Sequence, residues 1–107
     1  MPNGILLVAI DDNNNVIGMV AYHKHSNIRC EMKRLYVSPD CRGMKLGEKL
    51  IKEIIEHAKK VEYKEMALDM IKPLQTAIYL YNKYGFVDSE LYYDNPMNDV
   101  IYMKLDL

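Results

Sequence analysis

The sequence predicts a single α+β domain, residues 1–107, in which two helices pack on a mixed β-sheet. Its 107 residues match the usual size of one domain, and 50% of them are hydrophobic, which is enough for a packed core. Apolar residues form strand-like runs in the first third of the chain and recur at helical spacing after Gly43. Strand and helix patterns then alternate, so both kinds of element belong to one fold.

The first three predicted elements are strands. Residues 4–10 form a continuous apolar run that ends in a polar Asp-Asn turn, and residues 16–24 form a second run, so the two predict a hairpin. Apolar and polar side chains partly alternate over residues 30–37, and Pro39 ends this strand because proline cannot continue a ladder. We therefore expect an antiparallel meander.

The periodicity then changes to that of a helix over residues 45–60. Leu46, Leu50 and Ile54 fall on one face, and charged residues fall on the other. Gly85 stands where a left-handed cap would end a second helix. The remaining elements are, in order, a strand, that second helix and two strands: residues 66–71, 75–84, 86–93 and 100–107.

The predicted order is therefore β-β-β-α-β-α-β-β. The strand, helix and strand at residues 30–37, 45–60 and 66–71 imply a parallel pair joined by a crossover helix. The strands on either side are expected to be antiparallel. Together these features predict an α+β fold with a mixed sheet.

Charge and composition argue against several classes of partner. Fourteen basic and fifteen acidic residues leave a formal charge of −1, without the basic excess typical of nucleic-acid binders. The longest apolar run, residues 5–10, is too short to span a bilayer, and no basic-then-apolar leader is visible. Cys30, Cys41 and the three histidines form no metal-ligand pattern. We expect a reduced, cytoplasmic protein with no metal, nucleic-acid or membrane partner.

The segment that joins the third strand to the first helix has the composition of an anion-binding loop. Backbone N–H groups at a helix N-terminus bind phosphate, and Arg42 and Lys45 add positive charge there. Gly43 and Gly47 permit a close approach of the backbone to a ligand. A plain connecting loop is an equally good interpretation of this stretch alone, since it matches neither nucleotide-binding glycine motif.

Two motifs together resemble the GNAT superfamily of acetyl-CoA-dependent N-acetyltransferases. The family's loop signature [QR]-x-x-G-x-[GA] is matched at its first and last positions by Arg42 and Gly47. A second family element, A-x-x-L-Y-x-x-x-G-F, follows in the family's order. It is matched by Ala77, Leu80, Tyr81, Gly85 and Phe86.

The sequence departs from the family pattern at three places. Lys45 stands where the loop's middle glycine is usual, and Leu74 stands where the family often has an asparagine. The chain also begins near the family's second strand, so the usual first strand and the helices after it are lacking from this sequence. We expect a short member or a C-terminal piece whose exposed apolar surface favours a homodimer.

The resemblance implies that acetyl-CoA binds between two parallel strands that separate. The backbone of Leu35, Tyr36 and Val37 would pair with the pantetheine arm. The pyrophosphate would lie on the loop. Its six residues are Arg42, Gly43, Met44, Lys45, Leu46 and Gly47.

The resemblance also suggests catalytic residues. Tyr81 occupies the family's general-acid position, from which a phenol would protonate the departing thiolate. Glu31 is a general base, an anchor for the substrate ammonium or a solvated edge residue. Weaker candidates for handling the amine proton are His23, His25 and Asp69, whereas Tyr79 and Tyr84 are expected to pack, and residues 92–97 to line the acceptor side.

These features favour an N-acetyltransferase that transfers an acetyl group to a primary amine of a small molecule, an amino-acid derivative or a peptide. The first alternative is a non-catalytic module that binds acetyl-CoA or CoA as a sensor or partner. The second is an interaction domain that binds no cofactor. No feature of the sequence identifies the amine acceptor.

Overall fold

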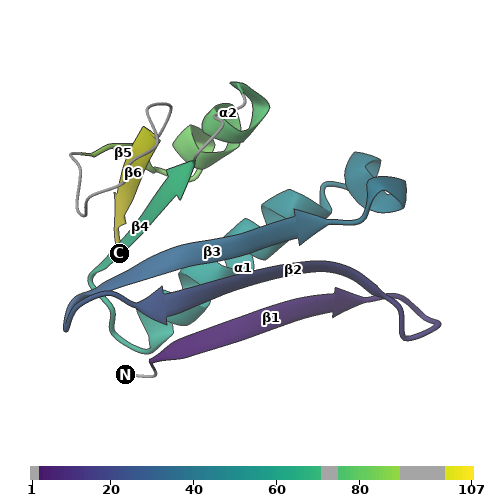
Figure 1. The fold of residues 1–107 in the computed structure, drawn as a ribbon, viewed down its shortest axis with the longest axis horizontal. Helices are drawn as coiled ribbons and strands as arrows, with labels where there is room; N and C mark the ends of the chain where they lie inside the picture. Colours follow the sequence, from purple (N-terminus) through teal and green to yellow (C-terminus); the bar gives the residue numbers. More distant parts are fainter. Residues whose placement is uncertain (1–2, 71–74, 90–100) are drawn as a thin grey trace.

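The structure is a computed structural model that describes residues 3–70, 75–89 and 101–107, without the side chains of residues 42–44, 75 and 76. Its helices and strands follow the predicted order (Figure 1). In chain order they are β1 (Gly4–Ile10), β2 (Val16–Lys24), β3 (Arg29–Val37), the 3-10 helix η1 (Pro39–Met44), α1 (Leu46–Lys60), β4 (Glu65–Met70), α2 (Gln75–Lys83), β5 (Val87–Asp88) and β6 (Ile101–Asp106).

The predicted element boundaries are close to the observed ones. The bounds of β1 and β2 are confirmed, and those of β3, α1 and α2 differ by a single residue at one end. Within the segment that joins β3 to α1, residues 39–44 form a 3-10 helix, which the sequence analysis did not predict. The strand predicted over residues 86–93 is observed only at β5, and residues 90–100 lie outside the described part of the chain.

The strands form one mixed sheet in the order β1-β2-β3-β4-β6-β5. The pairs β1–β2 and β2–β3 are antiparallel, which confirms the predicted meander. Strands β3 and β4 are parallel, as the crossover pattern predicts, whereas β6 pairs antiparallel with β4 and with β5.

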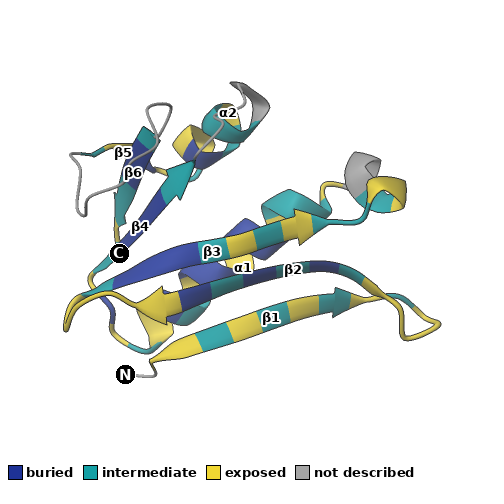
Figure 2. Ribbon diagram, in the orientation of Figure 1, coloured by how far each residue is buried: buried dark blue, intermediate teal, exposed yellow. Residues whose placement is uncertain are grey.

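The core lies between this sheet and α1, which covers one face of β1–β3 (Figures 1 and 2). Ile51 and Ile54 of α1 are fully buried against Val20 and Tyr22 of β2. At Gly18 α1 approaches the sheet closely: a Cβ atom there would lie 2.9 Å from Leu50 Cδ1. Local sequence patterns give no indication of this requirement for glycine.

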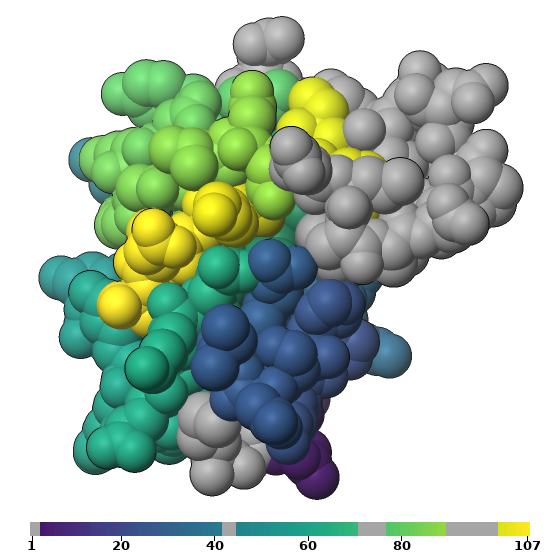
Figure 3. Space-filling view, turned by 90° about the vertical axis from the view of Figure 1, so that its left-hand side faces the viewer, coloured from purple at the N-terminus to yellow at the C-terminus, as the bar shows by residue number. Residues whose placement is uncertain are grey.

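The second helix packs at the other half of the sheet. Tyr81 of α2 lies edge-on to Phe86, with 5.6 Å between the ring centroids. Gly85 has φ = +100°, which confirms the predicted left-handed cap. In the space-filling view, β6 (yellow) lies between the green residues of α2 and β5 and the teal residues of α1 and β4 (Figure 3). None of the described helices is long and apolar enough to cross a membrane.

Candidate active site

Strands β3 and β4 begin as a parallel pair and then separate. They pair at only three positions, from Arg29↔Glu65 to Glu31↔Ala67. Beyond Glu31 the ribbons of the two strands diverge (Figure 1). Within the described part of the chain, no strand pairs with the β4-facing edge of β3 over residues 32–37. The backbone groups of that edge are therefore open to an extended ligand that adds to the sheet.

A cavity of about 170 Å³ lies where the two strands separate. Residues 32–35 of β3 line one side, Leu68 and Asp69 of β4 line the other, and Tyr81 of α2 also contributes. The structure thus brings Tyr81 to the same opening as Leu35, although the two are far apart in the sequence.

Tyr81 is buried, and this burial raises the pKa of its phenol, which therefore keeps its proton at neutral pH. No hydrogen bond joins its hydroxyl to any of the described residues. The hydroxyl of Tyr84, by contrast, donates to Glu48 Oε1 at 3.2 Å, and Tyr79 is exposed. Tyr81 is thus the one of these three tyrosines that lines the opening.

Four charged or titratable side chains form a chain across β2, β3 and β4 beside the opening. His23 Nε2 lies 2.7 Å from Glu31 Oε1, and Lys33 Nζ lies 3.1 Å from the same oxygen. Lys33 Nζ also donates to Asp69 Oδ1 at 3.0 Å. The side chains of Glu31 and Asp69 are only 5% and 8% exposed. Glu31 is therefore not a solvated edge residue, which removes that interpretation.

The ion pairs also determine the charge state of Lys33. Burial lowers the pKa of Lys33, but hydrogen bonds to Asp69 and Glu31 outweigh this effect and leave the pKa raised. Lys33 therefore stays an ammonium, which the two carboxylates share as an ion-pair partner. Since Lys33 and Glu31 lie two residues apart on β3, their common face could be expected from the sequence. The contact with Asp69 could not, because it depends on how β3 and β4 sit side by side.

A second cavity, of about 450 Å³, borders the same charged group. It is lined by Ala21, Tyr22 and His23 of β2 and by Lys33 and Arg34 of β3. Lys33 and Arg34 also line the smaller cavity, so these two residues lie at the boundary between the two spaces. His25, the weaker histidine candidate, lines neither cavity within the residues described for them.

The N-terminus of α1 follows η1 directly, and Lys45 joins the two helices. Lys45 has φ = 56°, a left-handed conformation that costs an L-residue about 1–2 kcal/mol relative to glycine. No side chain caps α1, so the backbone N–H groups of its first turn are left to solvent or a ligand. The side chains of Arg42 and Met44 lie outside the described residues, as does Leu74.

An ion pair ties the start of α1 to the end of α2. Lys83 Nζ donates to Glu48 Oε1 at 2.6 Å. The pKa of Glu48 is lowered, chiefly by this hydrogen bond, so the carboxylate stays charged. The helix that carries Tyr81 is thereby held to the helix whose N-terminus forms the predicted phosphate site.

Both cysteines are free thiols. Cys30 is buried, which raises the pKa of its thiol to about 12 and makes it unreactive. Over the described residues, no three His, Cys, Asp or Glu side chains come together as a metal-binding group.

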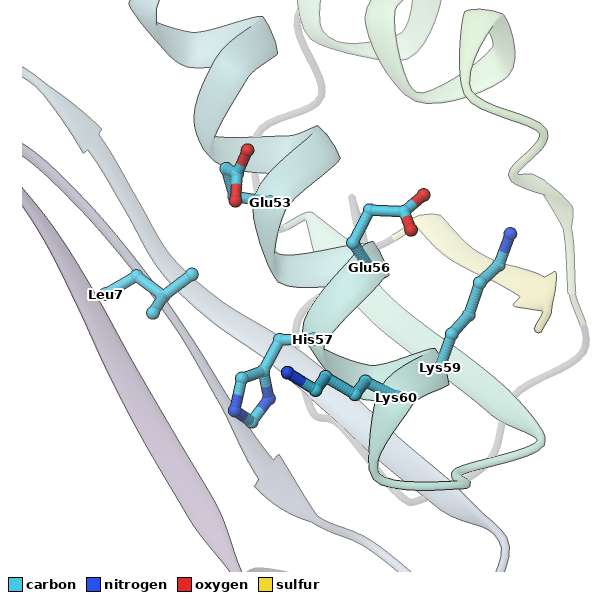
Figure 4. Close-up of a pocket in the computed structure, with 6 residues that line it drawn as sticks. All are labelled: Leu7, Glu53, Glu56, His57, Lys59 and Lys60. Atoms are coloured by element: carbon cyan, nitrogen blue, oxygen red, sulfur yellow. The ribbon is translucent and has the colours of Figure 1, made fainter.

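A larger groove lies away from the opening, between β1 and the second half of α1. It measures about 590 Å³ and is lined by Leu7 and by five polar or charged side chains of α1 (Figure 4). His57 Nδ1 lies 2.9 Å from the Tyr22 hydroxyl, so His57 already has a hydrogen-bond partner in the core. This groove contains none of the residues predicted to act in catalysis.

Comparison with known proteins identifies the family of this chain. The model of the acetyltransferase (GNAT) family matches residues 1–86. The chain belongs to the GNAT family. An uncharacterized N-acetyltransferase of Schizosaccharomyces pombe is 47% identical over 107 residues, which are 99% of this chain and 66% of that protein. One from Dictyostelium discoideum is 47% identical over 79 residues, or 73% of this chain and 37% of that protein.

Solved structures show the same fold. A GNAT acetyltransferase of Staphylococcus aureus superposes with a TM-score of 0.84 at 21% identity, covering 96% of this chain and 68% of that one. A GNAT acetyltransferase of Elizabethkingia anophelis, solved with acetyl-CoA bound, gives a TM-score of 0.83 at 25% identity, covering 98% of this chain and 77% of that one. This GNAT domain thus spans about two thirds or less of the length of the two curated relatives.

Proposed function

We propose that this GNAT domain transfers the acetyl group of acetyl-CoA to a primary amine by direct attack. The observation that carries the proposal is the separation of β3 from β4 after three residue pairs, with Tyr81 on the wall of the resulting cavity. Catalysis would come mainly from holding the amine and the thioester together and from backbone donors aimed at the developing oxyanion.

Two features of this chain support the proposal that it binds acetyl-CoA. The open edge of β3 at residues 32–37 suits the extended pantetheine arm, whose amides can pair with strand backbone. The uncapped first turn of α1, together with Lys45, suits the pyrophosphate. One solved relative, from Elizabethkingia anophelis, has acetyl-CoA bound. We therefore assign Leu35, Tyr36, Val37 and the six residues 42–47 to cofactor binding.

The reaction needs two proton transfers. The attacking amine forms the new N–C bond and loses a proton, and the C–S bond then breaks and releases a thiolate that gains one. Tyr81, which is protonated at neutral pH, would supply the proton to the thiolate.

The amine proton would pass to the His23–Glu31 pair. A carboxylate accepts hydrogen bonds, so Nε2 of His23 donates to Glu31 and the other ring nitrogen of a neutral imidazole is free to accept a proton. His23 is 56% exposed and lines the 450 Å³ cavity, whereas Glu31 is buried behind it. In this proposal Glu31 orients His23 rather than acting as the base itself.

An acceptor screen tests the function. The purified chain is incubated with acetyl-CoA and a panel of primary amines, and the free thiol of released CoA is measured. Amine-dependent CoA release with formation of the acetylated amine is the expected result. A folded protein that releases no CoA with any amine would contradict the proposal.

A non-catalytic acetyl-CoA-binding module is the second candidate. The observation that favours it is the departure from the family's loop at Lys45, which holds a left-handed conformation where the family usually has glycine. Thermal stabilisation by acetyl-CoA without any transfer would support this alternative. Absence of both stabilisation and transfer would indicate an interaction domain that binds no cofactor.

A further inference from the structure

Arg34 occupies a β-bulge at the boundary between the two cavities of the candidate site. Met19 pairs with Tyr36 and Ala21 pairs with Lys33, so β3 carries one more residue than β2 between these pairs. Arg34 itself has φ = 59°, a left-handed conformation that is unfavourable for a residue with a side chain. Bulges and strained residues of this kind are enriched beside functional sites, where they redirect a side chain.

The bulge places Arg34 on the wall of both spaces. It lines the 170 Å³ cavity together with Tyr81 and Asp69. It also lines the 450 Å³ cavity together with His23. A group bound to Arg34 would therefore lie near both residues that the proposed reaction uses for proton transfer.

Among the described residues that line the opening, Arg34 is the cation left available to a ligand. Lys33, its neighbour, is held by ion pairs between the carboxylates of Glu31 and Asp69. Arg34 is exposed, and it forms no ion pair or hydrogen bond with any residue of the described part of the chain. Its guanidinium can thus bind an oxyanion through two parallel hydrogen bonds.

We infer that the amine acceptor carries an anionic group, a carboxylate, that Arg34 binds. The inference rests on the proposed acetyl transfer and narrows its acceptor to amino acids and other amino-carboxylates. The amine would lie toward His23 and the carboxylate toward Arg34. A phosphate group could use the same guanidinium, so the experiment includes acceptors of both kinds.

The test compares matched acceptors. The rate constant kcat/KM is measured for α-amino acids and the corresponding amides, and for an aminoalkyl phosphate and the corresponding amino alcohol. The ratio of kcat/KM for the acid to kcat/KM for its amide is then compared between the wild type and each variant. The differing basicity of the two amines cancels in this comparison, because it is the same for every protein. We expect Arg34→Gln to lower this ratio about 10- to 100-fold, as for loss of a charge-assisted hydrogen-bond pair.

Two further variants separate charge from backbone effects. Arg34→Gly removes the side chain and fits the left-handed φ, so it should fold at least as well as the wild type and lower the ratio equally. Lys52→Gln removes an exposed cation of α1 and should leave the ratio unchanged. An unchanged ratio in both Arg34 variants would overturn the inference. If the Arg34 variants lose only the preference for the aminoalkyl phosphate over the amino alcohol, the group that Arg34 binds is a phosphate and not a carboxylate, and the inference of a carboxylate is overturned.

A binding measurement distinguishes failure of this inference from failure of the proposed function. Calorimetry with CoA present measures the affinity of the same acids and amides without turnover. Acid binding that Arg34→Gln abolishes, with no turnover of any amine, would support the Arg34 site and contradict acetyl transfer. Turnover of neutral amines without any preference for acids would support acetyl transfer and contradict the Arg34 site.

Discussion

Lys33 Nζ of β3 lies 3.0 Å from Asp69 Oδ1 of β4, beyond the last position at which the two strands pair. The same ammonium lies 3.1 Å from Glu31 Oε1. An ion pair between side chains thus links β3 and β4 just beyond the last backbone pairing of the two strands. We interpret this ion pair as an interaction that fixes the distance between β3 and β4 beside Tyr81.

Removing this bridge should weaken the fold. Lys33→Met leaves two poorly exposed carboxylates without their shared cation, which we expect to lower the free energy of unfolding by about 1–3 kcal/mol. Urea denaturation at neutral pH measures the effect, and Lys52→Gln controls for the lost charge. Equal stability of Lys33→Met and wild type would show that the bridge contributes nothing.

The contribution of Lys33 should also depend on pH. Its pKa in the folded protein is raised above the ordinary value of 10.5, so its stabilising effect is complete below that value and is lost as the pH rises through the folded pKa. The difference in unfolding free energy between wild type and Lys33→Met should therefore be constant from pH 7 to 9 and shrink above about pH 10.5. A difference that persists undiminished at pH 12 would contradict this assignment.

Tyr81→Phe tests the general acid. Because only a hydroxyl without a described partner is removed, the fold and the KM for acetyl-CoA should be unchanged, while kcat falls by about 10²- to 10⁴-fold. Tyr79→Phe is the matched control, since Tyr79 is exposed and should retain full activity. Wild-type kcat in Tyr81→Phe would remove Tyr81 from the mechanism.

Lys45 allows strain and charge to be separated. Lys45→Gly should be more stable than Lys45→Ala by about 1 kcal/mol, because only glycine adopts φ = 56° without strain. Both variants should bind acetyl-CoA more weakly and with a smaller dependence on salt, since both lack the ammonium. Thermal denaturation and calorimetry at two salt concentrations measure these effects. Unchanged affinity in both would exclude Lys45 from the phosphate site.

Gly18 in the core and Gly47 in the predicted phosphate site should respond differently to alanine. At Gly18 a Cβ would lie 2.9 Å from Leu50 Cδ1 and 3.1 Å from the Tyr36 carbonyl oxygen, so Gly18→Ala should cost about 1–3 kcal/mol of stability. At Gly47 the nearest atom, Val37 Cγ2, would be 3.6 Å away. Gly47→Ala should therefore fold normally and lose acetyl-CoA affinity instead. Denaturation and calorimetry on both variants test the contrast.

We propose that two copies of this chain associate through strand β1. Leu6, Val8 and Ile10 are 51–55% exposed and alternate with residues that pack against the core. Strand β1 has no charged residue, and within the described sheet it is an edge strand that pairs with β2 alone (Figure 2). An apolar, uncharged edge strand favours association. We expect a dimer in sedimentation at micromolar concentration and a monomer for Val8→Lys. A monomeric wild type would contradict this.

The sequence by itself determined the order of the helices and strands and the positions of the two family motifs along the chain. Strand runs, helical spacing and the cap at Gly85 are patterns of near neighbours, and they placed most boundaries within one residue. Tyr81 and the loop before α1 were found in the same way, because each belongs to a short motif of fixed spacing.

Only the tertiary structure decided how these pieces meet. The separation of β3 from β4 after Glu31, the contact of Lys33 with Asp69 and the bulge at Arg34 each depend on register and twist between strands that are distant in sequence. The hydrogen bond between His23 and Glu31 also depends on strand register, since His23 of β2 pairs with Glu31 of β3. Local propensity carries no information about such pairings, because they are selected by the packing of the whole sheet against α1.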